Sequence, residues 1–258
     1  MKYILSWSGG KDSTASIILA HENKEPLDVI VFSEVMYDRK NNISGEQPAH
    51  IHFIRNIAKP LLESWGYQVL ILRGKQDYLD CFYRIIEHPR KHKEHKGKHF
   101  GFPVSGLCSV KRDCKERPIK EYYQMLTEPY VQYVGICIDE PERLKSLHKD
   151  DSKVSLLEKY NYTEEMARRK CEEYGLLSPC YELSKRGGCW FCPNAKLEEH
   201  REIRKRYPKS WEQFVGLEQM ENIAFDKWNV YSGTLQDRER ILKMQESYQQ
   251  MSIWDFCE

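Results

Sequence analysis

The chain has 258 residues, of which 40% are hydrophobic and 31% charged, proportions that suit a globular protein with one large domain, or one domain and an extension. Its 40 basic and 39 acidic residues give a net charge of +1, which excludes a protein that binds polyanions over its whole surface. No apolar run approaches the roughly 18 residues of a membrane span, and the N-terminus lacks the plan of a signal peptide. We therefore expect a cytoplasmic protein without membrane contact.

The first predicted strand, residues 2–6, leads directly into Ser8-Gly9-Gly10-Lys11-Asp12-Ser13, and a helix is predicted over residues 14–22. Glycines leave room for an anion beside backbone N–H groups, the lysine adds a positive charge, and the helix start adds its dipole. The common P-loop pattern does not fit, because Leu5 replaces its first glycine and Asp12 its Ser or Thr. The segment predicts a nucleotide-phosphate site made by Ser8, Gly9, Gly10, Lys11 and Ser13. Asp12 would seat Mg²⁺ or cap the helix.

Further strand patterns follow at residues 28–32, 67–72 and 131–138, and the segments between them have helical periods. These helices are predicted at residues 45–65, 77–87 and 111–126. The alternation indicates an α/β fold, a doubly wound and mostly parallel sheet whose ligands bind at the carboxyl ends of the strands.

Two segments are locally basic. Residues 88–99 hold five Lys or Arg, four His and one acid without apolar period, and therefore predict a loop. Residues 201–206 add Arg201, Arg204, Lys205 and Arg206 on a predicted helix. Both could bind the phosphates of a nucleic acid, tRNA or DNA, or be solvated surface.

The pattern changes after residue 150, where helices are expected at residues 163–174, 196–207, 209–223 and 234–250 and no strand is expected. We therefore predict a nucleotide-binding α/β domain over residues 1–150. A helical C-terminal extension over residues 151–258 would pack on it and carry a cysteine cluster.

That cluster consists of Cys180, Cys189 and Cys192, spaced C-x8-C-x2-C with glycines before the second cysteine. Such thiolates can bind one metal ion or the irons of a cluster. Cys108, in a glycine-containing loop, is the predicted fourth ligand, and Cys114 is the alternative. The spacing alone leaves Zn²⁺ and a 4Fe-4S cluster open.

The Ser8–Ser13 segment resembles the PP-loop of the ATP pyrophosphatase (adenine nucleotide alpha hydrolase) superfamily. Residues 135–143 and the stretch from Cys108 to Pro118 are similar to segments of its PAPS reductase family. The cysteine spacing resembles that of the sulfurtransferase of bacterial DNA phosphorothioation, a family member with a 4Fe-4S cluster. The likeness covers most of residues 1–195, but Cys137 stands where the family has Arg and Pro141 where it has Ser.

The resemblance implies a HUP/PP-loop fold and an enzyme that cleaves ATP, with Mg²⁺, to AMP and pyrophosphate. It also favours a 4Fe-4S cluster over zinc as the group that the cysteines bind. Lys11, Asp12 and Ser13 would be catalytic. The adenine nucleotide would also contact Phe32, Ser33, Gly135, Glu140 and Arg143. The adenylated acceptor would then receive sulfur from a cysteine desulfurase or another donor.

Two other functions stay open. A sulfonucleotide reductase would need a tail cysteine, and Cys257 lacks the Gly and His that accompany it in that family. A non-catalytic nucleotide-binding protein with a structural zinc would bind ATP without turnover.

Overall fold

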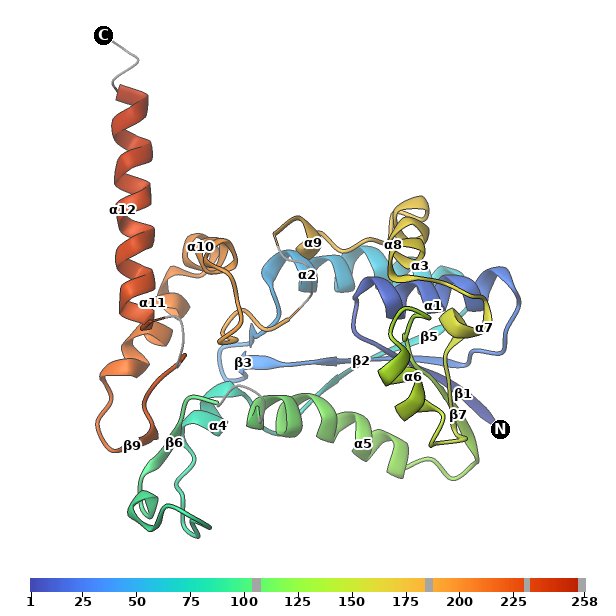
Figure 1. Cartoon of the computed structure of the whole chain (residues 1–258), viewed down its shortest axis with the longest axis horizontal. Coiled ribbons are helices and arrows are strands. Elements are labelled where there is room, and N and C mark those ends of the chain that lie inside the picture. Colours follow the sequence, from blue (N-terminus) through green and yellow to red (C-terminus); the bar gives the residue numbers. More distant parts are fainter. Residues whose placement is uncertain (104–107, 184–187, 230–232, 255–258) are drawn as a thin grey trace.

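A parallel sheet of five strands lies at the centre of the protein (Figure 1). The computed structural model describes residues 1–103, 108–183, 188–229 and 233–254. The strand order is β5-β2-β1-β7-β8, and every neighbouring pair is parallel. The bounds are β1 Lys2–Trp7, β2 Val29–Glu34, β5 Gln68–Arg73, β7 Tyr130–Tyr133 and β8 Lys153–Val154. The predicted α/β fold with a mostly parallel sheet is confirmed.

Helices cover both faces of the sheet, an arrangement compatible with a doubly wound fold (Figure 1). One face carries α1 Lys11–Glu22, α2 Pro48–Phe53, α3 Lys59–Ser64, α7 Leu156–Lys159 and α8 Glu164–Glu173. The other carries α5 Arg117–Gln124 and α6 Pro141–Leu147.

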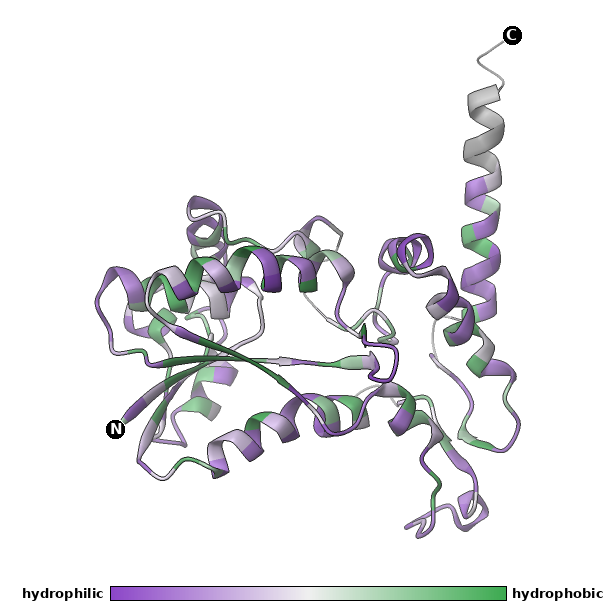
Figure 2. Cartoon of the chain, turned by 180° about the vertical axis from the view of Figure 1, so that it is seen from behind, coloured by the Kyte–Doolittle hydropathy of each residue, from purple (hydrophilic) through white to green (hydrophobic). Residues whose placement is uncertain are grey.

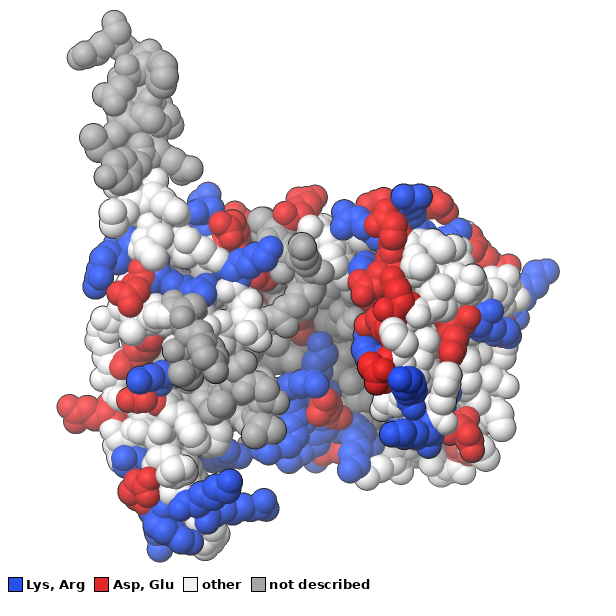
Figure 3. Space-filling view, viewed as in Figure 1, with Lys and Arg blue, Asp and Glu red and all other residues white. Residues whose placement is uncertain are grey.

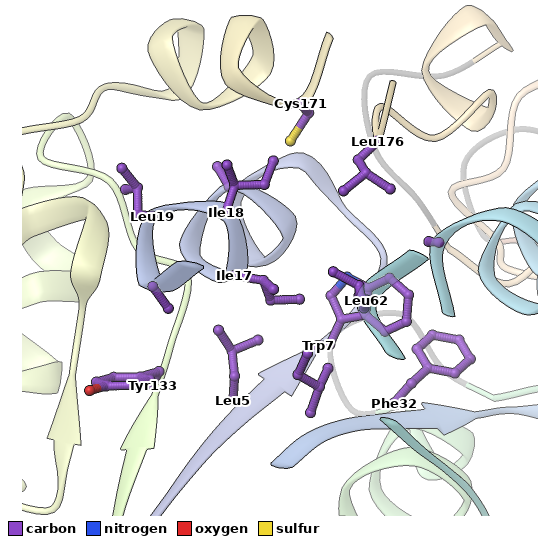
Figure 4. Packing of buried hydrophobic residues seen from close by; sticks show 14 of the residues in the cluster. Leu5, Trp7, Ile17, Ile18, Leu19, Phe32, Leu62, Tyr133, Cys171 and Leu176 are labelled. Atoms are coloured by element: carbon purple, nitrogen blue, oxygen red, sulfur yellow. The ribbon is translucent and has the colours of Figure 1, made fainter. Parts of the chain in front are cut away.

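Alternation along the strands builds a core on each face. Leu5 of β1 packs with Ile17 and Ile18 of α1, whereas the neighbouring Ile4 packs with tyrosines of α5. Figure 4 shows α1 between the strand residues Leu5 and Trp7 on one side and Cys171 and Leu176 on the other. Helix α1, which begins at Lys11 inside the Ser8–Ser13 segment, is therefore packed from two sides.

A second core lies beside the sheet and is rich in aromatic residues. It is formed by α4 Tyr78–Tyr83, α10 Leu197–Arg206, α11 Pro208–Gly216 and α12 Leu235–Trp254, with the strand β3 Met36–Asp38. Trp190 and Phe191, between two predicted metal ligands, are buried in it. Hydrophobic colour runs along the strands of the sheet, whereas the coloured part of α12 is mostly hydrophilic (Figure 2).

Two of the long predicted helices contain π-helical segments, η1 Ile54–Ala58 and η3 Lys111–Glu116. Each ends two residues before a proline, Pro60 in α3 and Pro118 in α5. Because proline has no N–H to bond the carbonyl four residues earlier, the upstream turn widens.

Several predicted boundaries are wrong. Strands do occur after residue 150: β8 completes the sheet, and β9 Ile223–Phe225 pairs with β6 His99–Gly101. The helix predicted to residue 223 therefore ends at Gly216 and is followed by the 3-10 turn η4 Leu217–Gln219. The helix predicted to residue 87 ends at Tyr83, because Ile85 forms a β-bridge with His99. The division at residue 150 stays a prediction.

The remaining short elements are β4 Ile43–Ser44, which pairs with β3, the 3-10 turn η2 Lys93–His95, and α9 Cys180–Leu183. None of the helices in the described part of the chain has the length and apolar character that crossing a bilayer requires.

Candidate active site

The segment Ser8–Ser13 forms a compact loop between β1 and α1. Gly9 has φ +71°, and a Cβ there would lie 2.3 Å from the Ile54 side chain, so this position requires glycine. The Ser8 and Ser13 hydroxyl oxygens are 3.1 Å apart, and the Gly10 N–H donates to Ser8 Oγ at 3.2 Å. The loop is thus held in shape by its own side chains.

Lys11 stands at the start of α1 between two carboxylates. Its Nζ donates to Asp12 Oδ1 at 2.8 Å and to Glu164 Oε2 at 2.6 Å. Burial lowers the pKa of Lys11, but these two hydrogen bonds outweigh burial and raise it overall, so the lysine is charged at neutral pH. Burial raises the pKa of Asp12 despite the lysine. The N-cap of α1 is Gly10, and Asp12 lies in the first turn, so both of its proposed roles, seating Mg²⁺ and capping the helix, stay predictions.

The backbone of Lys11 has an oxygen partner from a distant part of the chain. Its N–H donates to the Tyr181 hydroxyl at 2.9 Å, and a Cβ on Gly10 would lie 3.1 Å from the same oxygen. Tyr181 follows the predicted ligand Cys180. The amide end of α1 therefore already accommodates an oxygen acceptor, as it would for a phosphate oxygen.

Gly135, beyond the end of β7, touches the first turn of α1. A Cβ there would lie 2.6 Å from Ser13 N and 2.7 Å from Asp12 C. Glu140 accepts the Cys137 N–H at 3.2 Å and also pairs with Arg143. The structure therefore brings Gly135 and the segment after it against the Ser8–Ser13 loop.

A cavity of about 390 Å³ opens at this junction. The loop and the segment after β7 contribute to the lining, and residues from four other segments complete it. Its lining residues are Ser6, Ser8, Gly10, Lys11, Asp12, Ser13, Glu46, His50, Lys115, Val134, Gly135, Arg143, Glu164, Tyr181 and Gly188.

Four predicted nucleotide contacts, Gly9, Phe32, Ser33 and Glu140, do not line this cavity. Phe32 is fully buried and packs its ring against Trp7 and His50, with ring centroids 5.8 and 6.4 Å away. Ser33 is also buried, and its Oγ has no hydrogen-bond partner. Neither residue lines the cavity.

The segment around Cys189 lies beside the cavity, whose lining includes Gly188. Cys189 forms an antiparallel bridge with Glu46, and the Trp190 N–H donates to the Gly45 carbonyl at 3.0 Å. Burial raises the pKa of the Cys189 thiol well above its usual range, and the nearby Glu46, Cys192 and Cys108 add to the shift while Lys115 opposes it. Three of the four predicted sulfur ligands, Cys108, Cys189 and Cys192, are therefore close enough for their charges to affect one another's pKa.

Cys180 is joined to the phosphate loop by a chain of polar contacts. His50 Nε2 lies 3.1 Å from the Ser8 carbonyl oxygen, and its Nδ1 lies 2.7 Å from Ser178 Oγ. Ser178 Oγ is in turn 3.2 Å from Cys180 Sγ. Burial lowers the pKa of His50 and raises that of Cys180 to about 11, so both are neutral here. No sequence pattern pointed to His50 or Ser178.

The arrangement of the sulfurs bears on the kind of metal group. A tetrahedral zinc with Zn–S of about 2.3 Å needs sulfurs about 3.8 Å apart. Among the described residues, no three cysteine sulfurs lie within 4.8 Å of one another; only His92, Glu94 and His95 bring three potential ligand atoms that close. Cys257 lies outside the described residues.

The two basic segments differ in their pairing. In α10, Arg204 pairs with Glu239 at 2.9 Å and with Glu246, Arg201 donates to Gln245 at 2.5 Å, and Arg206 lies 3.7 Å from Glu202. Its arginines are thus engaged by α12 and by α10 itself. Residues 88–99 form an exposed loop, as predicted, with the short turn η2.

His200, in the second core, should make stability fall in mild acid. Burial and the nearby Arg238 lower its pKa from 6.5 to about 3, so between these values only the unfolded chain is protonated. Stability is then lost as pH falls below 6.5, by about 1.4 kcal/mol per pH unit. Urea unfolding from pH 7 to 5 should show a weaker pH dependence in His200→Asn but not in His148→Asn, whose imidazole is 58% exposed. The same change of the free energy of unfolding with pH in the wild type, His200→Asn and His148→Asn would contradict this.

Comparison with known proteins gives little guidance. No family model matches the chain. It is 23% identical over 256 residues to an uncharacterized protein of Methanocaldococcus jannaschii, in an alignment that covers 93% of this chain. The chain spans about half the length of that relative, 53% of it.

Proposed function

We propose that the protein is an ATP-cleaving, adenylating enzyme of the HUP/PP-loop type that acts in sulfur transfer or nucleic-acid modification. The observation that carries the proposal is the cavity in which the Ser8–Ser13 loop faces the segment containing Cys180 and Cys189. A nucleotide bound by its phosphates at the loop would be close to the cysteines.

In this reaction an acceptor atom bonds to the α-phosphorus while the bond to the bridging oxygen breaks and pyrophosphate leaves. The backbone N–H groups of Gly10 and Lys11, the Lys11 ammonium and the Ser8 and Ser13 hydroxyls would bind the leaving oxygens. Such fixed donors favour the transition state, where charge grows on those oxygens. The phosphate would take the position now held by the Tyr181 hydroxyl on the Lys11 amide. Asp12 and Glu164 would be available to Mg²⁺.

The cysteines Cys108, Cys180, Cys189 and Cys192 would hold a 4Fe-4S cluster, and zinc is the alternative. Bound there, the cluster would supply sulfur-transfer or redox chemistry beside the adenylated acceptor. The four thiols, and the C-x8-C-x2-C spacing of three of them along the sequence, support this choice.

Product analysis tests the function directly. Protein given ATP, Mg²⁺ and pooled tRNA or DNA as acceptor should form AMP and pyrophosphate in equal amounts. Formation of ADP and phosphate, or binding of PAPS in preference to ATP, would contradict the proposal. The second result would favour the reductase.

The metal group gives a separate prediction. Protein purified without oxygen should be brown and absorb broadly near about 400 nm, and Cys189→Ser should lose this colour together with its iron. Cys171→Ser is the matched control, because its buried sulfur lies on α8 and donates to the Lys11 carbonyl at 3.2 Å, a bond that serine can keep. A colourless wild type with stoichiometric zinc would establish the alternative.

A further inference from the structure

An arm projects from the second core between α4 and β6 and lies at the lower left of Figure 1. Backbone bonds close it: Ile86 N–H donates to the Lys98 carbonyl, and Gly97 N–H donates to the Ile86 carbonyl, both at 2.9 Å. Farther along, β6 pairs with β9. The arm is therefore a built structure, although no helix longer than a single turn lies in it.

A groove of about 740 Å³ follows the inner side of this arm. Its floor is aromatic: the rings of Phe100 and Phe225 are 4.9 Å apart, and the His95 ring is 5.5 Å from Phe225. The Arg84 guanidinium lies over Phe100 at 4.6 Å, and the neighbouring Ile85 is 46% exposed. Flat rings with an adjoining guanidinium form a surface on which nucleobases can stack.

The rim of the groove is strongly basic. Residues 84–98 contain six Lys or Arg and two Glu. Within the described structure, Arg90, Lys91, Lys96 and Lys98 make no ion pair, in contrast to the paired arginines of α10. Figure 3 shows the basic side chains gathered at this lower left corner of the molecule. Unpaired cations are the partners that backbone phosphates need.

We propose that this groove binds single-stranded nucleic acid, with bases on Phe100 and Phe225 and phosphates on Arg90 and Lys91. The bases of a duplex are already stacked and their faces are covered, so a single strand is the form that fits an aromatic floor. The inference names a partner for the proposed enzyme but does not depend on ATP cleavage.

The test is fluorescence anisotropy with a labelled oligothymidylate, an abasic strand of the same length and a duplex. EDTA is present, so that a metal held by His92, Glu94 and His95 cannot account for binding. Oligothymidylate should bind at least about tenfold more tightly than the abasic strand. Its log affinity should fall linearly with log salt.

The variants separate stacking from charge. Phe225→Leu and Phe100→Leu should each lower oligothymidylate affinity by about tenfold and leave abasic binding unchanged, whereas Lys91→Glu should weaken both. Arg206→Glu is the matched control, because this exposed arginine lies on α10 and should change affinity less than twofold. If the Phe variants do not fold, Arg90→Glu with the abasic strand still tests the groove.

Equal affinity for oligothymidylate and the abasic strand, tighter binding of the duplex, or no binding at low salt would each overturn the proposal. Lys11→Ala should bind oligothymidylate as the wild type does. A failure of the groove and a failure of the ATP site are therefore distinguishable.

Discussion

Replacing Lys11 with alanine should lower pyrophosphate release by about 100-fold or more, because a fixed cation at the leaving oxygens is lost. Its ammonium is held beside the loop by Asp12 and Glu164, whereas the other two cations of the cavity lining, Lys115 and Arg143, belong to other segments. Release is followed by a coupled pyrophosphate assay with saturating ATP. Lys11→Arg should recover part of the rate, because the charge is kept.

Lys170→Ala provides the matched control. Lys170 is 16% exposed and pairs with two carboxylates, Glu22 and Glu173, much as Lys11 is 14% exposed and pairs with two. It lies on α8 outside the cavity lining. Removing the Lys170 side chain should lower the free energy of unfolding by a similar amount and leave the rate of pyrophosphate release unchanged. A wild-type rate in Lys11→Ala would show that Lys11 has no part in the reaction.

The second large effect is expected at Gly135. In Gly135→Ala the new Cβ would meet the backbone of Asp12 and Ser13 at 2.6 to 2.7 Å, and backbone cannot rotate away as a side chain can. Either β7 or the start of α1 must shift, which should lower the free energy of unfolding by about 1–3 kcal/mol. Because the shift falls on the phosphate loop, ATP should also stabilise the variant less than the wild type in thermal unfolding.

Gly216→Ala is the control for this substitution. A Cβ at Gly216, at the end of α11, would meet no atom within 4 Å, and its φ is not in the left-handed region. Alanine there should be neutral or stabilise the protein by up to about 1 kcal/mol. If Gly135→Ala unfolds with the same free energy as the wild type and is stabilised as much by ATP, the contact between the segment after β7 and the start of α1 is not rigid.

Four of the five strands of the sheet, β1, β2, β5 and β7, and the glycine-containing loop after β1 could be predicted because their signals are local. An apolar run, two glycines and a lysine lie within the first eleven residues, and the alternation of strands and helices indicates a parallel sheet. The short strands β4 and β9 could not be predicted, because two or three residues carry no period and are fixed only by their partners β3 and β6.

The sequence by itself determined the α/β class and the position of the Ser8–Ser13 loop between the first strand and the first helix; the phosphate and metal roles stay predictions. Only the tertiary structure decided which distant side chains complete the site, since Tyr181 and Glu164 reach Lys11 across 170 and 153 residues and leave no local pattern. It also separated two basic segments that look alike in sequence. Acidic side chains of α12 pair with Arg204 of α10, whereas the arm keeps unpaired cations beside an aromatic groove. Pairing depends on what packs alongside a segment, and packing is a property of the fold.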